Sequence, residues 1–102
     1  DIGRHFPDND PAYKGISSLK LLAHVTQLMQ AQGYALGNLD AIIIAQKPRM
    51  SGYIDQMRAN LADVMQAAPE CVSIKATTTE GLGFTGTGDG IAAEAIAQVV
   101  RR

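Results

Sequence analysis

Tryptophan is absent from this sequence of 102 residues, and Cys71 is its only cysteine. A single cysteine excludes an internal disulfide framework, and together with two histidines it makes a poor ligand set for zinc. The formal net charge is only −1, so composition provides no general attraction to nucleic acid or to an anionic membrane. Aromatic residues make up 5% of the chain, which argues against a surface on which bases stack.

Long apolar runs are missing too, since no segment approaches the roughly 20 residues that a membrane span requires. We therefore expect neither a nucleic-acid partner nor a membrane partner. A bacterial cytoplasm fits the single cysteine, and a plastid-type organelle fits it as well. The length and the apolar fraction of 46% suit one globular domain over residues 1–102. Because the chain starts at Asp1, directly within a motif, we expect this domain to lack an N-terminal part.

Apolar periodicity predicts a helix over about 18–32, capped by Ser17 or Ser18, with Gly33 just beyond its end. The buried stripe of this helix would consist of Leu21, Leu22, Val25, Leu28 and Met29. His24 falls on the other side of the helix. We therefore interpret His24 as an exposed residue rather than a metal or substrate ligand.

Other patterns predict a loop, two strands and a second helix. Residues 1–15 contain two prolines and no apolar periodicity, which predicts a loop. The β-branched run 41–45 predicts a strand buried on both faces. A helix is predicted over 52–67, ended by Pro69, and a second strand over 71–76. The helix would bury Ile54, Met57, Leu61, Val64 and Met65, and the strand would place Val72, Ile74 and Ala76 on one face.

The last segment, residues 91–102, fits two secondary structures. Its alanines favour a helix, whereas its apolar residues divide more evenly between the two faces of a strand. We predict a strand. Strands mixed with helices in this order indicate an α+β fold.

Two segments at the ends of predicted strands contain groups suited to a ligand. Lys47, Arg49 and Met50 follow the strand at 41–45 and could form the rim of a binding site, although a solvated turn has the same composition. Residues 75–90 contain three consecutive threonines, Glu80 and five glycines. Hydroxyls and free backbone N–H groups suit phosphate oxygens, and a long turn would use the same residue types.

The glycine spacing Gly81, Gly83 and Gly86 also matches the G-x-G-x-x-G fingerprint of dinucleotide-binding domains. That fingerprint requires a following helix and an acidic residue about 20 positions further on. The chain ends before that position, so we interpret this match as accidental.

Three motifs together resemble one family. Asp-Ile-Gly-Arg-His-Phe-Pro-Asp-Asn-Asp-Pro at 1–11, Ile-Ile-Ala-Gln-Lys-Pro-Arg-Met at 43–50 and Lys-Ala-Thr-Thr-Thr-Glu at 75–80 occur in the order and spacing of 2-C-methyl-D-erythritol 2,4-cyclodiphosphate synthase. Residues 82–86 and 90–92 continue the likeness. The resemblance covers this whole chain and roughly the last two thirds of the family's chain.

The resemblance implies a two-layer α/β sandwich, with a mixed sheet, helices on one face, and sheets gathered around a trimer axis. It implies a lyase of the non-mevalonate isoprenoid pathway, acting on 4-diphosphocytidyl-2-C-methyl-D-erythritol 2-phosphate. In the family the 2-phosphate attacks the β-phosphorus, CMP leaves, and a cyclic diphosphate forms. Phosphoryl transfer depends mainly on alignment and charge stabilisation, which these residue types can provide. The implied partners are this small-molecule substrate and two further copies of the chain, which share active sites.

Site residues follow from the same resemblance. Thr78 matches the transition-state stabiliser, and Glu80 matches the ligand of a magnesium or manganese ion on the diphosphate. Residues 45–50 with Ala76 match the cytidine pocket. The complete set of implied substrate contacts is Asp1, Ile2, Gly3, Phe6, Pro7, Asp8, Asn9, Asp10, Ala45, Gln46, Lys47, Pro48, Arg49, Met50, Ser51, Ala76, Thr77, Thr78, Thr79, Glu80, Phe84 and Thr87.

The sequence departs from the family in two respects. Thr87 stands where many members have an arginine, although its usual acidic partner, Glu94, is present. The family's zinc is held by an Asp-x-His pair and a further histidine upstream of Asp1, and neither His5 nor His24 matches them. We therefore expect this chain alone to bind no catalytic zinc and to turn over little substrate.

Two other functions fit parts of the sequence. A catalytically silent trimeric module could keep the cytidine-nucleotide pocket without the chemistry. A structural α/β assembly domain would bind no nucleotide at all, which the threonine and proline motifs disfavour. Formation of the cyclic diphosphate separates the first alternative from the synthase, and nucleotide binding separates the second.

Overall fold

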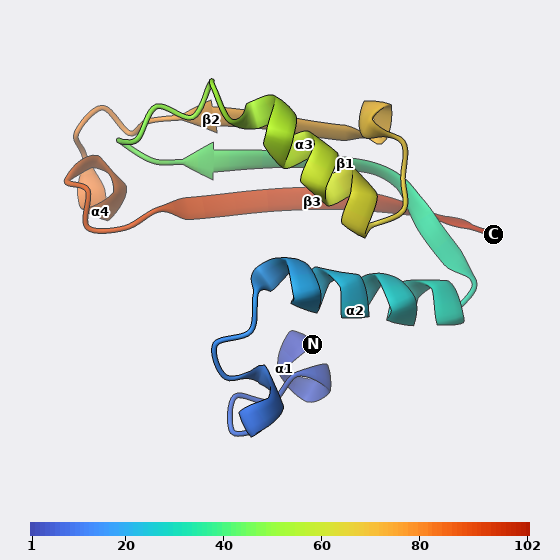
Figure 1. Cartoon of the computed structure of the whole chain (residues 1–102). Coiled ribbons are helices and arrows are strands. Elements are labelled where there is room, and N and C mark those ends of the chain that lie inside the picture. Colours follow the sequence, from blue (N-terminus) through green and yellow to red (C-terminus); the bar gives the residue numbers. More distant parts are fainter.

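A three-stranded mixed sheet is the centre of the fold. The computed structural model describes all residues from Asp1 to Arg102. Strand β1 (Tyr34–Ile44) is the middle strand of the order β2-β1-β3. It pairs in parallel with β2 (Val72–Thr77) and antiparallel with β3 (Ala92–Arg101). Figure 1 shows the three strands side by side, with the carboxyl ends of β1 and β2 at the same edge.

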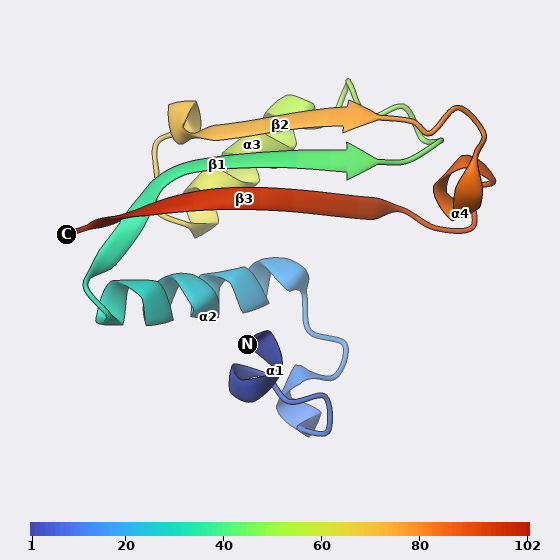
Figure 2. The ribbon, with the colours of Figure 1, turned by 180° about the vertical axis from the view of Figure 1, so that it is seen from behind.

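A helix lies across one face of this sheet, and a second helix lies beyond the edge that β3 forms (Figure 1). The chain passes from β1 to the parallel strand β2 through α3 (Ile54–Val64), because a parallel pair requires a crossover. Helix α2 (Ser18–Ala31) contacts both α3 and β1. The opposite face of the sheet has no helix on it (Figure 2). This arrangement confirms the predicted α+β class and mixed sheet. None of the helices combines the length and the apolar character needed to cross a membrane.

The core is small and lies between α3 and the sheet. Ala62 and Met65 are buried at the end of α3, and Val72 is buried at the start of β2. Arg58 fixes this junction, because its Nε donates a hydrogen bond to the Val72 carbonyl at 2.8 Å and its guanidinium also donates to the Pro69 carbonyl at 3.0 Å. The start of β2 is thus held to α3 by packing and by two hydrogen bonds.

The strand predicted over 41–45 is longer and less buried than expected. It begins at Tyr34, and a register shift between Leu36 and Asn38 marks a β-bulge at Gly37. A Cβ at Gly37 would lie 3.1 Å from the Gln98 carbonyl oxygen, so a glycine fits this close approach of two backbones. Residues 41–44 are half-buried, because only one face of the sheet has a helix across it.

The limits of helix α2 agree with the prediction, but the burial of its apolar side chains does not. Ser17 caps it by accepting a hydrogen bond from the Leu19 N–H at 3.2 Å, and Gly33 follows its end with φ of 87°. Val25 and Leu28 were expected in the buried stripe, yet they are 37% and 42% exposed. The prediction was wrong there, because these two side chains border a cavity between α2 and the N-terminal segment, which Ile2 and Phe6 also line. His24 is exposed, as predicted.

The second half of the chain differs from prediction mainly at element boundaries. Helix α3 is shorter than the predicted 52–67, and it ends before Gln66, which has a positive φ of 55°. Pro69 does not end this helix but begins a 3-10 helix, Pro69–Cys71. Strand β2 accordingly begins at Val72 rather than at residue 71. The predicted final strand is confirmed as β3.

The N-terminal segment is not the irregular loop that was expected. It contains a one-turn helix α1 (Ile2–His5) and a 3-10 helix η1 (Pro11–Tyr13), capped by the carboxylates of Asp1 and Asp10. Phe6 is buried, with its ring centroid 5.2 Å from the Tyr13 ring and 6.0 Å from the His24 ring. Figures 1 and 2 both show this segment on the side of α2 away from the sheet.

The glycine-rich segment connects β2 to β3 and contains a one-turn helix α4 (Gly83–Gly86). These two strands are not neighbours, because β1 lies between them. The segment therefore carries the chain past the end of β1 rather than forming a hairpin. No long helix follows the glycines, so the dinucleotide-binding interpretation is excluded, as predicted.

Candidate active site

A cleft of about 510 Å³ lies beyond the carboxyl ends of β1 and β2. The register pairs Ile44 with Thr77, so the loops that follow the two strands begin side by side. Ligands of open α/β sheets bind at such carboxyl ends. The cleft is lined by Ala45, Gln46, Pro48, Arg49, Met50, Ser51, Ile54, Ala76, Thr77 and Thr78.

The structure thus brings together two motifs that are about 30 residues apart in the sequence. All the lining residues except Ile54 belong to the predicted substrate contacts. Ile54 was missed because its helical spacing assigned it to the core, whereas it is the first residue of α3 and faces the cleft. The start of α3 therefore borders the cleft, and the positive end of a helix dipole favours an anion there.

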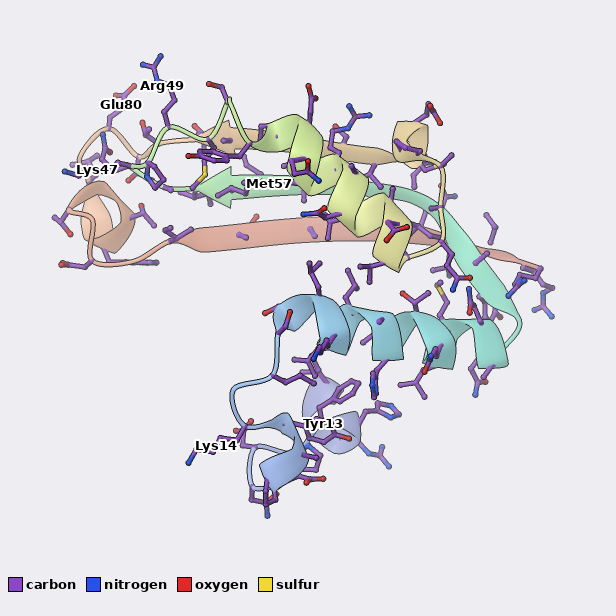
Figure 3. The ribbon with its side chains drawn as sticks, in the orientation of Figure 1. Tyr13, Lys14, Lys47, Arg49, Met57 and Glu80 are labelled. Atoms are coloured by element: carbon purple, nitrogen blue, oxygen red, sulfur yellow. The ribbon has the colours of Figure 1, made fainter.

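Charged side chains surround this cleft. Arg49 lines it, and Lys47 lies on the same loop. Figure 3 shows Arg49 and Glu80 projecting from neighbouring loops at this end of the molecule, with Lys47 beside them. Two cations and one carboxylate at the edge of a cleft suit a phosphate ester with a bound divalent cation.

The Gln46 side chain joins the two loops. Its Oε1 accepts a hydrogen bond from the Gly81 N–H at 3.1 Å. Gln46 follows β1 and Gly81 follows the threonines, so this bond fixes the distance between the two sides of the cleft. Gln46 was predicted as a substrate contact, and the structure also gives it this bridging role.

Residues Thr79 to Leu82 form a tight turn. The Leu82 N–H donates to the Thr79 carbonyl at 3.0 Å, and the central residues Glu80 and Gly81 have φ values of 54° and 82°. A turn with positive φ at both central positions is of type I′, which favours glycine, asparagine and aspartate. Glutamate is unfavourable there, by about 1–2 kcal/mol for an ordinary L-residue. Backbone strain thus coincides with the residue predicted to bind the metal.

The three threonine hydroxyls have different partners. Thr77 donates to the Thr78 carbonyl at 3.2 Å, and Thr79 donates to the Leu82 carbonyl at 2.6 Å. Thr78 instead accepts a hydrogen bond from the Glu80 N–H at 3.2 Å. The Thr78 hydroxyl lines the cleft and keeps its own hydrogen free for an incoming oxygen. Thr78 is the only one of the three threonines whose hydroxyl donates no hydrogen bond in the structure.

The other predicted contacts do not line this cleft. Asp1, Ile2, Gly3, Phe6, Pro7, Asp8, Asn9 and Asp10 all belong to the N-terminal segment. That segment packs against α2, on the far side of this helix from the sheet (Figure 1). Phe84 is 59% exposed on α4, and the Thr87 hydroxyl donates to the Asp89 carboxylate at 2.8 Å. The predicted contacts therefore fall into three groups, which lie in the cleft, in the adjoining loop and in the distant N-terminal segment.

The acidic and histidine side chains do not form a zinc site. No group of three or more histidine, cysteine, aspartate or glutamate residues is placed to hold a metal ion. The rings of His5 and His24 both lie near the Phe6 ring, and neither histidine lines the cleft. Glu80 is a single exposed carboxylate, and Mg²⁺ commonly takes one or two carboxylates together with substrate phosphates. A single carboxylate could therefore hold a divalent cation only together with oxygen ligands from a bound phosphate or water.

Comparison with known proteins gives a consistent result along the whole chain. The family model of the YgbB family matches residues 1–100. A 2-C-methyl-D-erythritol 2,4-cyclodiphosphate synthase from Alkaliphilus oremlandii is 56% identical over 101 residues, which are 99% of this chain and 64% of that protein. The chain therefore spans less than two thirds of this relative's length.

Solved structures match the fold. The bifunctional IspDF from Campylobacter jejuni matches with a TM-score of 0.93 and 31% identity, over 100% of this chain and 28% of that chain. IspF from Plasmodium falciparum, in complex with CDP, matches with a TM-score of 0.85 and 28% identity, over 100% of this chain and 60% of that chain. The mixed sheet with its helices is thus the fold of these structures.

The backbone strain at Glu80 can be tested by substitution. Asparagine tolerates positive φ better than glutamate, so Glu80→Asn should raise the free energy of unfolding by about 0.5–1 kcal/mol. The measurement is urea denaturation of the full-length protein at a fixed protein concentration. Glu70→Asn is the matched control, because Glu70 is exposed and is not among the residues with positive φ. A stability of Glu80→Asn no higher than that of the control would contradict the assigned strain.

Proposed function

Because this chain belongs to the YgbB family, we propose that its full-length protein is a 2-C-methyl-D-erythritol 2,4-cyclodiphosphate synthase. It converts 4-diphosphocytidyl-2-C-methyl-D-erythritol 2-phosphate to the cyclic 2,4-diphosphate and CMP, as a lyase of the non-mevalonate isoprenoid pathway. The observation that carries this proposal is the cleft itself, since two separate motifs of the family resemblance meet there.

The cleft accounts for the cytidine part of the substrate. Ala45, Met50, Ile54 and Ala76 provide apolar walls for a base, and loop backbone provides hydrogen-bonding groups. The matching Plasmodium falciparum structure is a CDP complex, which supports a cytidine nucleotide as the ligand class. In this arrangement the diphosphate lies beside Arg49 and Thr78, where a cation and a free hydroxyl hydrogen face it.

The chemistry requires alignment of two phosphates and stabilisation of charge. The 2-phosphate attacks the β-phosphorus, the bond to the α-phosphate oxygen breaks, and CMP leaves with the electron pair. Thr78 donates its free hydroxyl hydrogen to a phosphoryl oxygen as negative charge develops. Glu80 would hold magnesium or manganese, which neutralises phosphate charge when bound.

The separation of the N-terminal segment from the cleft supports a shared active site. We propose a homotrimer in which residues 1–10 of one subunit complete the cleft of its neighbour. The sheet face without helices exposes apolar residues of β3, including Ile96 at 74% and Val100 at 46%, and this face would pack around the trimer axis. We propose in addition that residues 1–102 are part of one longer domain, because they cover only 64% of the Alkaliphilus oremlandii relative.

The first test is product formation by the full-length protein, followed by phosphorus NMR. The expected result is CMP and a cyclic diphosphate, and Thr78→Val should lower kcat about 10²–10³-fold with nearly unchanged CDP affinity. Thr78→Ser, which keeps the hydroxyl, should retain most of the activity. If the wild-type protein binds CDP but forms no cyclic product, it is the catalytically silent cytidine-binding module instead.

The second test concerns the sharing of sites between subunits. Thr78→Val impairs the cleft and Asp8→Ala impairs the N-terminal segment, so each full-length variant alone should have little activity. If sites are shared, mixed trimers contain some sites with both parts intact, and random mixing of equal amounts should restore up to about one quarter of wild-type activity. Mixing should follow dissociation and reassembly. A mixture no more active than its components would show that each site lies within one subunit.

A further inference from the structure

We propose that Thr79 and Thr85 act as a positioning pair that holds Glu80 and Thr78 in their working orientation. This inference rests on the proposed function and assigns to Thr79 a role different from the substrate contact that the family resemblance implies. Thr85 belongs to α4, and sequence reasoning did not select it. The hydroxyls of the two residues lie within hydrogen-bonding distance of each other, next to the turn that contains Glu80.

The hydrogens of the two hydroxyls can be assigned from their partners. Thr79 Oγ1 lies 2.6 Å from the Leu82 carbonyl oxygen and 2.8 Å from Thr85 Oγ1. The Leu82 oxygen can only accept, so the single hydrogen of the Thr79 hydroxyl is used there. The hydrogen between the two threonines must then come from Thr85. Thr79 therefore has no hydrogen left to donate to a phosphate.

Two hydrogen bonds between Thr79 and Leu82 hold the turn that contains Glu80. Leu82 donates its N–H to the Thr79 carbonyl, and its own carbonyl accepts from the Thr79 hydroxyl. Glu80, between them, is held at φ of 54° although glutamate disfavours that conformation. A strained backbone persists only where its surroundings overdetermine it, and these two bonds provide that restraint.

Helix α4 packs directly against the turn. The Gly86 N–H donates to the Leu82 carbonyl at 3.1 Å, and a Cβ on Gly86 would lie 2.2 Å from the carbonyl carbon of Gly81. Thr85, next to it, is only 5% exposed, so its hydroxyl is shielded from competing water. The Thr79–Thr85 bond is thus the side-chain link between α4 and the turn.

The consequence for function is a division of work among the three threonines. Thr78 faces the cleft and accepts from the Glu80 N–H, so its position depends on the conformation of the turn. Loss of either hydroxyl of the pair would let Glu80 leave its strained conformation and would release Thr78 with it. The pair would thereby affect turnover without touching substrate.

The test compares Thr79→Val, Thr85→Val and the double variant in the full-length protein. Valine keeps the shape of threonine and removes only the hydroxyl. Two readouts are needed: kcat and KM for the cyclisation, and amide hydrogen exchange at Leu82 and Gly86. Thr26→Val is the matched control, because Thr26 is 1% exposed and its hydroxyl bonds only within α2, to the Leu22 carbonyl at 2.9 Å.

We expect each single variant to lower kcat about tenfold with little change in KM, and to speed exchange at the two amides about tenfold. The double variant should be no worse than Thr79→Val alone, because Thr79→Val already removes both hydrogen bonds of the Thr79 hydroxyl, including the one that Thr85 donates. Thr85→Ser should restore kcat and protection, and the control should match the wild type. These results together would support the positioning role.

Other results would overturn it. A loss of activity in Thr79→Val with wild-type exchange at both amides would mean that Thr79 contacts substrate directly. Full activity in Thr85→Val would mean that the Thr79–Thr85 bond is not needed for turnover. Wild-type exchange at Leu82 and Gly86 in both valine variants would mean that the pair does not hold the turn. If the wild-type protein forms no cyclic product, the proposed function fails, and the exchange data still decide whether the pair restrains Glu80.

Discussion

The pairing of β1 with a strand on each side is the constraint on which the rest of the structure depends. Because β1 and β2 are parallel and in register at Ile44 and Thr77, both chains leave the sheet at the same edge. The crossover required by a parallel pair places α3 on one face and starts it beside the cleft. The antiparallel strand β3 then obliges residues 78–91 to pass the end of β1. The cleft follows from this connectivity.

One loop combines an unfavourable backbone conformation with residues of the candidate site. Glu80 adopts a positive φ, and three glycines nearby serve separate purposes. Gly81 supplies the second positive φ of the turn, whereas Gly86 allows α4 to approach it closely. A Cβ at Gly90 would lie 2.9 Å from the Phe84 ring, so that glycine makes room for an aromatic side chain. The glycines shape the loop, and the functional groups come from the threonines and Glu80.

Much of this could be predicted from local sequence. The limits of α2 followed from Ser17 and Gly33, and the final strand followed from alternation of its residues. The cleft residues in 45–51 and 76–78 were selected by the family resemblance, which the geometry of the cleft matches. These successes share a cause, because capping, periodicity and the order of the motifs can all be read from the chain itself.

The remaining features depend on contacts between distant segments. The first half of β1 was missed because Gly37 resembles a turn residue, and only the partner strand reveals a bulge. Periodicity selected Val25 and Leu28 for burial, but it does not say how much of a helix is covered. The three threonines are alike in sequence, and their partners alone separate Thr78 from Thr79. The distance between the N-terminal segment and the cleft likewise required the fold.

The most direct measurement is a CDP titration of the isotope-labelled full-length protein, observed through its backbone amide signals. If the cleft binds the cytidine nucleotide, amides of 46–51 and 76–78 should shift in a saturable manner, and Arg49→Ala should weaken the binding. Pro48 gives no amide signal, so the neighbouring residues report on it. Saturable shifts that leave both segments unchanged would contradict the account, because the nucleotide would then bind elsewhere on the protein.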